Sequence, residues 1–445
     1  MAPKAVKVLL DAEVEAFLVE VFGAEYVTAL LAIASSPPSH TTVRVNTSVC
    51  SVPDAQALLE AAVGEHGFDV AVHSAIPDVL VVRDAAAEKI IPAPEFGPVV
   101  VDRRCGESVL RGGHVYIPGV LRAAKWKKAG DPVSVFAELP NSDGPGRIEV
   151  FIGNGTIVLD WDALMEAKDA RTGGLAVTMD AVVGPRAPSL HGLLSRELFA
   201  QNLPSTVVAH AALSGVALDD RTAAPLRVLD MCAAPGGKTS HIAQILASSP
   251  RGGHVWACER AGRRVDRLRE TIARLDLDAV CTVIKCDSAK LLKPRTGSSA
   301  QPDLALASFD VVLLDPQCSG LGLRPRFNET RINRAELSNM ADYQAKLASV
   351  AAGMVAPGGV IVYSTCTIDP LENEGVIAGL LSDSPHLSLV PLPPHLCIAR
   401  EGLSGQGLAD PLAALVQRFD PVAHDSPAFF VAKLTAATTS AAAKA

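Results

Sequence analysis

The chain has 445 residues, of which 49% are hydrophobic and 20% charged, and its formal net charge at pH 7 is −8. This length suits about three domains of ordinary size, and the composition is that of a folded globular protein. The negative charge argues against a protein that coats nucleic acid without specificity. No apolar run is long enough to cross a bilayer and no signal peptide is recognisable, so we expect a cytoplasmic protein.

The cysteines point away from both disulfides and zinc. There are nine of them, and none forms a Cys-x-x-Cys pair. An odd number of cysteines in a chain of this size does not indicate a disulfide scaffold, and the spacing does not fit a zinc ribbon. We therefore expect no metal, and each cysteine is either a core residue or a catalytic one.

The first 95 residues predict a small α/β region. Residues 11–34 carry one apolar stripe with helical spacing, which predicts an amphipathic helix. Residues 42–46 and 78–83 have the pattern of strands, and a second helix is expected from 51 to about 63. These residues name no activity by themselves.

Residues 96–188 predict a small β-barrel, because short β-type runs alternate with Gly- and Asn-rich turns. The runs at 114–120 and 130–135 resemble the PUA domain, an RNA-binding pseudo-barrel. Between 101 and 130 there are seven Lys or Arg against two acids, which favours a specific RNA site. The alternative is a generic β insertion.

Residues 189–435 change to alternating strands and helices. Strands are expected at 227–231, 254–258, 280–285, 309–314 and 360–363, and helices at 238–248, 260–275 and 335–353. This order predicts a Rossmann-like, doubly wound α/β sheet. Residues 429–433 are expected to close it as an edge strand, and residues 436–445 to form a disordered tail.

The turn after the first of these strands, residues 232–238, suits a polar cofactor at a helix N-terminus. Gly237, Lys238 and Thr239 imitate the end of a P-loop, but that motif requires a glycine where Cys232 stands. The dinucleotide fingerprint also fails. Glu259 and Asp287 end the next two strands, where carboxylates can bind a ribose and an adenine edge. A nucleoside without phosphates fits best, and S-adenosylmethionine is such a cofactor.

Two cysteines follow strands within polar turns, Cys318 after the fourth strand and Cys366 after the fifth. A thiolate that adds to carbon 6 of cytosine activates carbon 5 for methylation, and a base must then remove the carbon 5 proton. Asp315 can hydrogen-bond the cytosine edge, and Lys238 can lower a thiol pKa. A stacked base must be flipped or unpaired to reach such a site.

Three motifs resemble those of the Sun-domain RNA cytosine-5 methyltransferases: Asp230–Thr239, Asp315–Gly320 and Ser364–Glu374. The resemblance implies that Cys366 is the nucleophile and that Cys318 assists product release. Lys238 and Asp315 are the further catalytic residues. It also implies a cofactor pocket formed by Cys232, Ala233, Ala234, Pro235, Gly236, Gly237, Lys238, Glu259, Asp287 and Asp315.

A PUA-like segment before the catalytic domain is similar to the sixth Sun-domain type, which methylates cytosine 72 in the tRNA acceptor stem. The resemblance therefore implies tRNA as partner, messenger RNA as a further substrate, and a monomer. Gln317 departs from the family pattern, and the turn at 139–147 has no lysine. Ribosomal RNA as substrate and a non-catalytic RNA-binding factor remain alternatives. DNA is disfavoured as a substrate because cytosine-5 DNA methyltransferases typically attack from the cysteine of the Asp-Pro-type turn, here Cys318, and lack the second cysteine.

Overall fold

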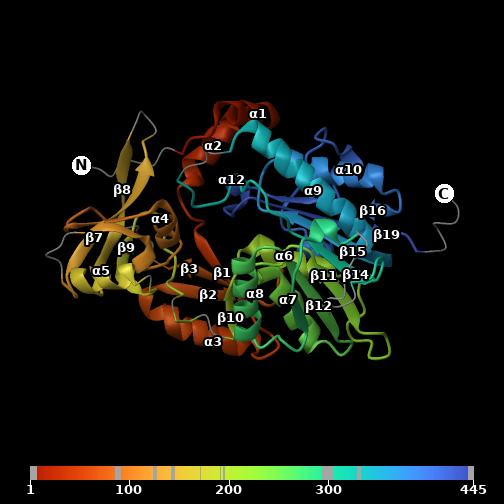
Figure 1. Ribbon diagram of the computed structural model, residues 1–445, viewed down its shortest axis with the longest axis horizontal. Helices are drawn as coiled ribbons and strands as arrows, with labels where there is room; N and C mark the ends of the chain where they lie inside the picture. Colours follow the sequence, from red (N-terminus) through yellow and green to blue (C-terminus); the bar gives the residue numbers. More distant parts are fainter. Residues whose placement is uncertain are drawn as a thin grey trace.

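The computed structural model describes residues 8–85, 92–123, 128–141, 146–170, 172–190, 192–193, 196–292, 304–327 and 332–438. Three sheets organise this part of the chain. The six-stranded sheet lies at one end of the molecule, the nine-stranded sheet at the other, and the four-stranded sheet between them (Figure 1).

The four-stranded sheet has the order β10-β1-β3-β2 and is antiparallel throughout. Its elements are β1 (His40–Val45), β2 (Phe68–Val72), β3 (Val79–Asp84) and β10 (Leu198–Ala200), covered by α3 (Val52–Val63) and η1 (Gly64–His66). The strand β10 comes from the segment 189–435 of the sequence. The small α/β region is therefore completed by a strand from the start of the catalytic segment.

The predicted helix over 11–34 is wrong in one respect, since two helices occur: α1 (Ala12–Phe22) and α2 (Ala24–Ala34). Gly23 separates them with φ of 86°, a left-handed conformation that glycine adopts readily and that breaks a helix. Leu18 and Leu30 of this pair share a core with Leu337 and Ile368. The two helices thus pack on the catalytic domain.

The six-stranded sheet has the order β5-β9-β8-β7-β4-β6. Its strands are β4 (Pro98–Val101), β5 (Val115–Tyr116), β6 (Val120–Ala123), β7 (Pro132–Pro140), β8 (Arg147–Ile157) and β9 (Leu175–Val182), with α4 (Arg103–Leu110), η2 (Ile117–Gly119) and α5 (Trp161–Asp169). The strands β5 and β6 are the first and last in this order, yet only the three residues of η2 separate them in the chain. Three residues reach about 10 Å, too short to cross a flat six-stranded sheet, so the sheet curls around one core.

The nine-stranded sheet confirms the predicted doubly wound architecture. Its order is β13-β12-β11-β14-β15-β19-β18-β17, with β16 beside β19, and its first five strands are parallel. The strands are β11 (Leu226–Asp230), β12 (Gly253–Glu259), β13 (Cys281–Lys285), β14 (Phe309–Leu314), β15 (Val355–Thr365), β16 (Leu387–Leu389), β17 (Arg400–Glu401), β18 (Gln417–Phe419) and β19 (Phe429–Ala436). The chain order reverses between β11 and β14, and ligands of such sheets bind at this point.

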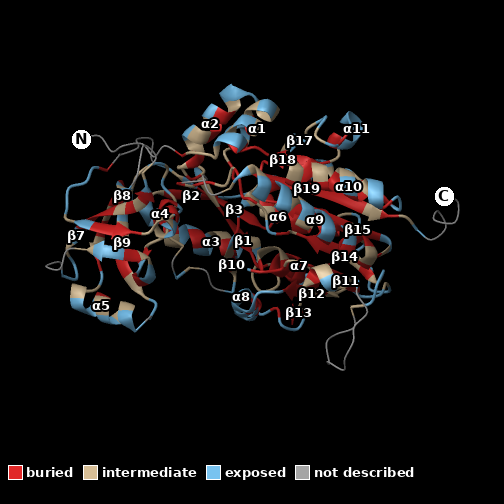
Figure 2. Ribbon diagram, turned by 45° about the horizontal axis from the view of Figure 1, so that its top comes forward, coloured by how far each residue is buried: buried red, intermediate tan, exposed pale blue. Residues whose placement is uncertain are grey.

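Helices cover both faces of this sheet because its strands are apolar on both sides, as parallel strands are. Val228 and Val311 face α6 (Leu203–Leu213), α7 (Gly237–Ser248) and α8 (Gly262–Arg274), whereas Leu229 and Val312 face α9 (Arg334–Met354) and α10 (Val376–Asp383). Figure 2 shows the strands buried and the helices exposed on their outer sides. The short turns η3 (Ser288–Lys290), η4 (Leu371–Gly375), η5 (Pro394–Leu396), α11 (Asp410–Ala413) and α12 (Pro421–His424) complete the domain.

The predicted edge strand at 429–433 is wrong, because β19 lies between β15 and β18. Its residues Phe430 and Val431 are fully buried, which an edge strand does not require. Ala436 ends β19, so regular structure extends one residue into the predicted tail, and residues 439–445 lie outside the described part of the chain. Among the described residues, no helix combines the length and apolar character that a bilayer crossing requires.

Candidate active site

The turn between β11 and α7 follows Asp230 and includes Gly236, whose φ is 108°. A Cβ at Gly236 would lie 2.9 Å from Leu268 Cδ1, so a side chain does not fit between this turn and α8. Gly236 therefore packs against α8. Its neighbours line a pocket of about 260 Å³: Cys232, Ala233, Ala234, Pro235, Gly237 and Lys238.

Asp230 lies at the base of this pocket, and the sequence argument did not assign it a site role. Thr239 Oγ1 donates to its Oδ2 at 2.6 Å, and Cys232 N donates to its Oδ1 at 3.2 Å. Burial raises the pKa of Asp230 to about 6. The sequence signal was available, because Asp230 is the last residue of the strand that leads into the turn.

Glu259 and Asp287 line a second, narrow pocket of about 40 Å³ next to the first, and Cys232 lies in both. Glu259 accepts a hydrogen bond from Ala261 N at 2.9 Å, and Arg264 lies 3.3 Å from its other oxygen. Asp287 accepts from Ala289 N at 3.2 Å. The remaining wall includes the ring of Tyr343, which sequence spacing on α9 did not reveal.

Lys238 and Asp315 meet across the sheet edge. Lys238 Nζ lies 2.7 Å from Asp315 Oδ2, and Ser364 Oγ donates to Asp315 Oδ1 at 2.7 Å. Both Lys238 and Asp315 line the first pocket. The predicted grouping of these two residues at the carboxyl ends of β11 and β14 is thus present, and Ser364 extends it to β15.

The two predicted cysteines also meet: the Sγ atoms of Cys318 and Cys366 are 3.2 Å apart. The hydrogen bond from Cys318 lowers the pKa of Cys366 despite burial, and Lys238 adds to that effect. The same hydrogen bond raises the pKa of Cys318, and burial raises it further. Cys366 is therefore the more acidic thiol of the pair and the better placed to act as a nucleophile.

The four-stranded sheet contributes Arg44, which is fully buried and was not predicted. Its guanidinium donates to Gly237 O at 2.6 Å, to Ser240 Oγ at 2.8 Å and to Gln201 Oε1 at 2.9 Å. Burial lowers the pKa of Arg44 to about 9, so it remains a cation at neutral pH. Arg44 thereby anchors the first turn of α7, on which Lys238 lies.

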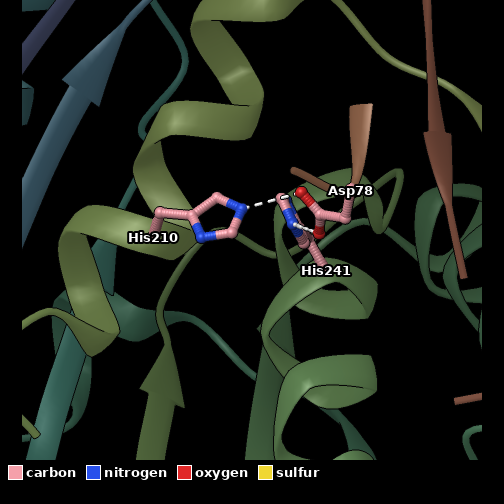
Figure 3. A group of neighbouring side chains, drawn as sticks. All are labelled: Asp78, His210 and His241. Carbon is pink, nitrogen blue, oxygen red and sulfur yellow. Dashed lines mark hydrogen bonds and ion pairs between the residues drawn. The ribbon is translucent and has the colours of Figure 1, made fainter. Parts of the chain in front are cut away.

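A second buried contact joins Asp78, which directly precedes β3, to His210 of α6 and His241 of α7, as Figure 3 shows. Asp78 Oδ1 lies 2.8 Å from His210 Nε2, and its Oδ2 lies 2.8 Å from His241 Nε2. These three side chains are near enough to hold a metal ion. However, each imidazole faces a different carboxylate oxygen, and within the described chain His241 Nδ1 has no acceptor, which a metal-bound histidine normally has. The arrangement is that of a hydrogen-bonded bridge.

Comparison with known proteins places these features in a family. Residues 218–435 match the family model described as 16S rRNA methyltransferase RsmB/F. The chain is 38% identical over 440 residues to mouse tRNA (cytosine(72)-C(5))-methyltransferase NSUN6, covering 93% of this chain and 88% of the mouse protein. It is 31% identical to the tRNA (cytosine(72)-C(5))-methyltransferase of Pyrococcus horikoshii, covering 95% and 96% of the two chains. The chain belongs to the RsmB/F family of Sun-domain RNA methyltransferases.

A solved structure extends this similarity to the whole fold. The crystal structure of NSun6 from Pyrococcus horikoshii with SFG superposes with a TM-score of 0.72 at 30% identity, covering 96% of this chain and 98% of that one. As a Sun-domain methyltransferase, the protein uses S-adenosylmethionine. In the second pocket Glu259 and Asp287 offer carboxylate acceptors beside an aromatic ring and an apolar wall, a set of groups with the chemistry that a nucleoside requires.

Proposed function

We propose that this protein methylates carbon 5 of a cytosine in tRNA, at cytosine 72 of the acceptor stem, with Cys366 as nucleophile. The observation that carries the proposal is the Cys318–Cys366 pair, 3.2 Å between sulfurs, beside Lys238 and Asp315. The full-length similarity to two tRNA (cytosine(72)-C(5))-methyltransferases supports the choice of tRNA.

The proposed cofactor site consists of the turn 232–238 with Glu259, Asp287 and Asp315. When bound, S-adenosylmethionine supplies an electrophilic methyl group. The carboxylate of Glu259 is suited to the ribose hydroxyls and that of Asp287 to the adenine edge, because both follow strands at the ligand-binding edge. Gly236 supports the turn from behind through its contact with α8 and is not itself a pocket residue.

The reaction begins at Cys366. Its thiolate forms a bond from Sγ to carbon 6 of the flipped cytosine, and the ring electrons move to make carbon 5 nucleophilic. Asp315 accepts hydrogen bonds at both oxygens in this structure, from Lys238 and Ser364, so its carboxylate is held ready to receive the cytosine amino group. Lys238 keeps a positive charge beside the attacking sulfur.

Product release requires loss of the carbon 5 proton, after which carbon 6 expels the sulfur and Cys366 becomes a thiolate again. Cys318 stands next to Cys366 and is the residue proposed to take part in this step. The proton leaves carbon 5 to a base, the bond electrons restore the aromatic ring, and the thiolate is the leaving group. Between addition and release, carbon 5 would take the methyl group of the bound sulfonium cofactor, whose sulfur would keep the bond electrons and leave as a neutral thioether, so no redox partner is needed.

The 96–188 unit is proposed to act as a PUA domain that binds the tRNA acceptor end. Its curled sheet around a single core supports this assignment. Of the basic residues at 101–130, Arg103 pairs with Glu107, Arg122 pairs with Glu138 and Glu149, and positions 125 and 127 lie outside the described chain. The proposed domain limits are 1–95, 96–188 and 189–435, and a cytoplasmic monomer that also accepts messenger RNA belongs to the same proposal.

The test is methyl transfer from labelled S-adenosylmethionine to tRNA transcripts, with the modified base located by sequencing. We expect 5-methylcytosine at position 72, none with Cys366→Ala, and a covalent RNA adduct that accumulates with Cys318→Ala. Undiminished methylation by Cys366→Ala would remove the assigned nucleophile, and the absence of a trapped adduct would remove the release role of Cys318.

Ribosomal RNA is the second candidate substrate, because the matching family model describes 16S rRNA methyltransferases. The same assay with ribosomal RNA distinguishes the two, since a cytosine 72 enzyme methylates tRNA and leaves the ribosomal RNA unlabelled. RNA binding without methyl transfer to either substrate would instead favour a non-catalytic RNA-binding factor.

A further inference from the structure

A buried carboxylate lies behind the two cysteines. Glu372 belongs to the π-helical turn η4 (Leu371–Gly375) and is fully buried. Its Oε2 accepts a hydrogen bond from Ser319 N at 3.0 Å, directly next to Cys318 in the chain. The same oxygen accepts from Gln344 Nε2 at 2.7 Å. Glu372 is thus attached to the backbone of the Cys318 turn.

The surrounding residues make this attachment rigid. Gln344 Nε2 also donates to Gln317 O at 2.9 Å, on the other side of Cys318. Tyr363 OH donates to the backbone oxygen of Glu372 at 2.6 Å, which ties η4 to β15 just before Cys366. The backbone on both sides of Cys318 is therefore fixed relative to the strand that carries Cys366, and the short distance between the sulfurs follows from it.

The charges around the sulfur pair are unequal. Lys238, Arg326 and Asp315 face Cys366, whereas the acidic group that faces Cys318 is Glu372. The hydrogen-bond donors to the Glu372 carboxylate are neutral, because the nearby Arg418 pairs with Glu374 instead. A cation near one sulfur and an unneutralised carboxylate near the other favour a proton on Cys318.

Asp369 is the other titratable group at this position, and its carboxyl lies close enough to Glu372 for each to influence the other. Burial raises the pKa of both carboxyls, that of Asp369 to about 7. Oδ2 of Asp369 has no hydrogen-bond partner in the described part of the chain, while Glu372 accepts from two N–H groups. The two N–H donors stabilise the carboxylate form of Glu372 and so oppose the effect of burial on its pKa.

We propose that Glu372 is a positioning residue of the cysteine pair: it holds the Cys318 turn against Cys366 and directs their shared proton to Cys318. This inference rests on the proposed function in that it explains why Cys366, and not Cys318, attacks the cytosine. Glu372 contacts neither cytosine nor cofactor in this role and acts through Cys318 alone.

The test measures the two thiols without RNA or cofactor. The full-length protein is alkylated with iodoacetamide from pH 5 to pH 10, and modification of Cys318 and Cys366 is followed separately by peptide mass spectrometry. In the unaltered protein Cys366 is expected to react at lower pH. In Glu372→Gln, whose remaining oxygen can still accept from Ser319 N, the Cys318 profile moves down by about one pH unit and the reactivity ratio Cys366 to Cys318 falls about tenfold.

Two further variants separate charge from fold. Glu336→Gln removes an exposed carboxylate from α9 and should leave both profiles unchanged. Glu372→Asp keeps the negative charge but shortens the side chain, so Cys366 should remain the more reactive thiol. The same variant can be measured in place of Glu372→Gln if that protein does not fold. Folded Glu372→Gln protein with the unaltered ratio and profiles would overturn the proposal, as would Cys318 reacting first in the unaltered protein. Because no methyl transfer is measured, failure of the proposed function gives a different result, namely normal thiol profiles without RNA methylation.

Discussion

The catalytic edge of the nine-stranded sheet and the outer surface of the six-stranded sheet both carry ion pairs, but the two kinds of pair differ in burial. At the catalytic edge the Lys238 side chain is 13% exposed and contacts Asp315 within a pocket. On the six-stranded sheet the Arg122 side chain is 51% exposed, and of its two partners Glu149 is 42% and Glu138 is 11% exposed. Buried groups are fixed by their protein partners, whereas exposed pairs exchange readily with water and ions.

This difference indicates a division of tasks. The proposed catalytic groups are held by their contacts with one another, as electrostatic preorganisation requires. In the proposed RNA-binding role of the six-stranded sheet, RNA phosphates would replace the acids that now pair with its arginines, which would make an adjustable contact. Substitutions at the first kind of site should alter the chemical step or stability strongly, and substitutions at the second should alter RNA binding weakly.

The largest effect is expected from Lys238→Met, which removes the cation beside Cys366 and leaves Asp315 without its ion-pair partner. We expect kcat to fall about 10²-fold or more, with a smaller change in KM. Steady-state methylation of tRNA measures both. Lys346→Met, an exposed lysine on α9, is the matched control. A kcat within twofold of the unaltered protein would contradict the assigned role of Lys238.

Arg44→Met should lower the free energy of unfolding by about 2–4 kcal/mol, because Gly237 O and Gln201 Oε1 lose their buried donor. Urea denaturation measures this change. Arg83→Met, an exposed arginine on the same sheet, is the control and should have little effect. If both variants were equally stable, the buried contact between the four-stranded sheet and α7 would not contribute to the free energy of unfolding in the way expected here.

The buried bridge predicts a pH effect of moderate size. Burial lowers the pKa of His241 to about 4, below the ordinary value of about 6.5 in the unfolded chain. Between these values the unfolded chain binds a proton that the folded protein does not, so stability falls as the pH decreases from 7 to 4. This group contributes up to about 3 kcal/mol. In His241→Gln, which keeps a donor for Asp78, the urea midpoints should depend less on pH. An unchanged pH dependence would show that His241 is not the group responsible.

The smallest effect is expected on the six-stranded sheet. Arg122→Ala should raise KM for tRNA by a few fold, leave kcat unchanged and reduce the dependence of binding on salt by about one phosphate contact. Filter binding over a salt series measures this. An effect on kcat as large as that of Lys238→Met would erase the distinction between the two surfaces.

The sequence predicted which candidate residues lie together because their positions follow from the fold class. In a doubly wound sheet, residues that directly follow parallel strands meet at one edge. Lys238, Asp315, Cys318 and Cys366 all stand just after predicted strands, and the structure brings them together. The doubly wound order itself followed from apolar runs alternating with amphipathic helices.

What the sequence could not reveal are contacts between distant segments. Arg44 lies in the first strand of the chain, and no local pattern indicates that it binds Gly237, 193 residues later. Glu372 was quoted within a motif, but its bond to Ser319 depends on the π-helical turn that follows Cys366. The interior place of β19 was missed for a related reason, since neighbours in space decide it. The break at Gly23 is instead a local effect of a glycine with positive φ, which the apolar stripe concealed.

The assignment of β10 to the four-stranded sheet has a practical consequence for anyone who wishes to build a smaller enzyme from this chain. A cut near residue 189 leaves Leu198–Ala200 as a strand without a sheet and removes Ile76 and Val79 from the core that also contains Val207 and Ile242. It also strips Ser240 and His241 of Arg44 and Asp78. The smallest unit that retains these contacts is therefore discontinuous in sequence. Chimeras between relatives should exchange the four-stranded sheet and the nine-stranded sheet together.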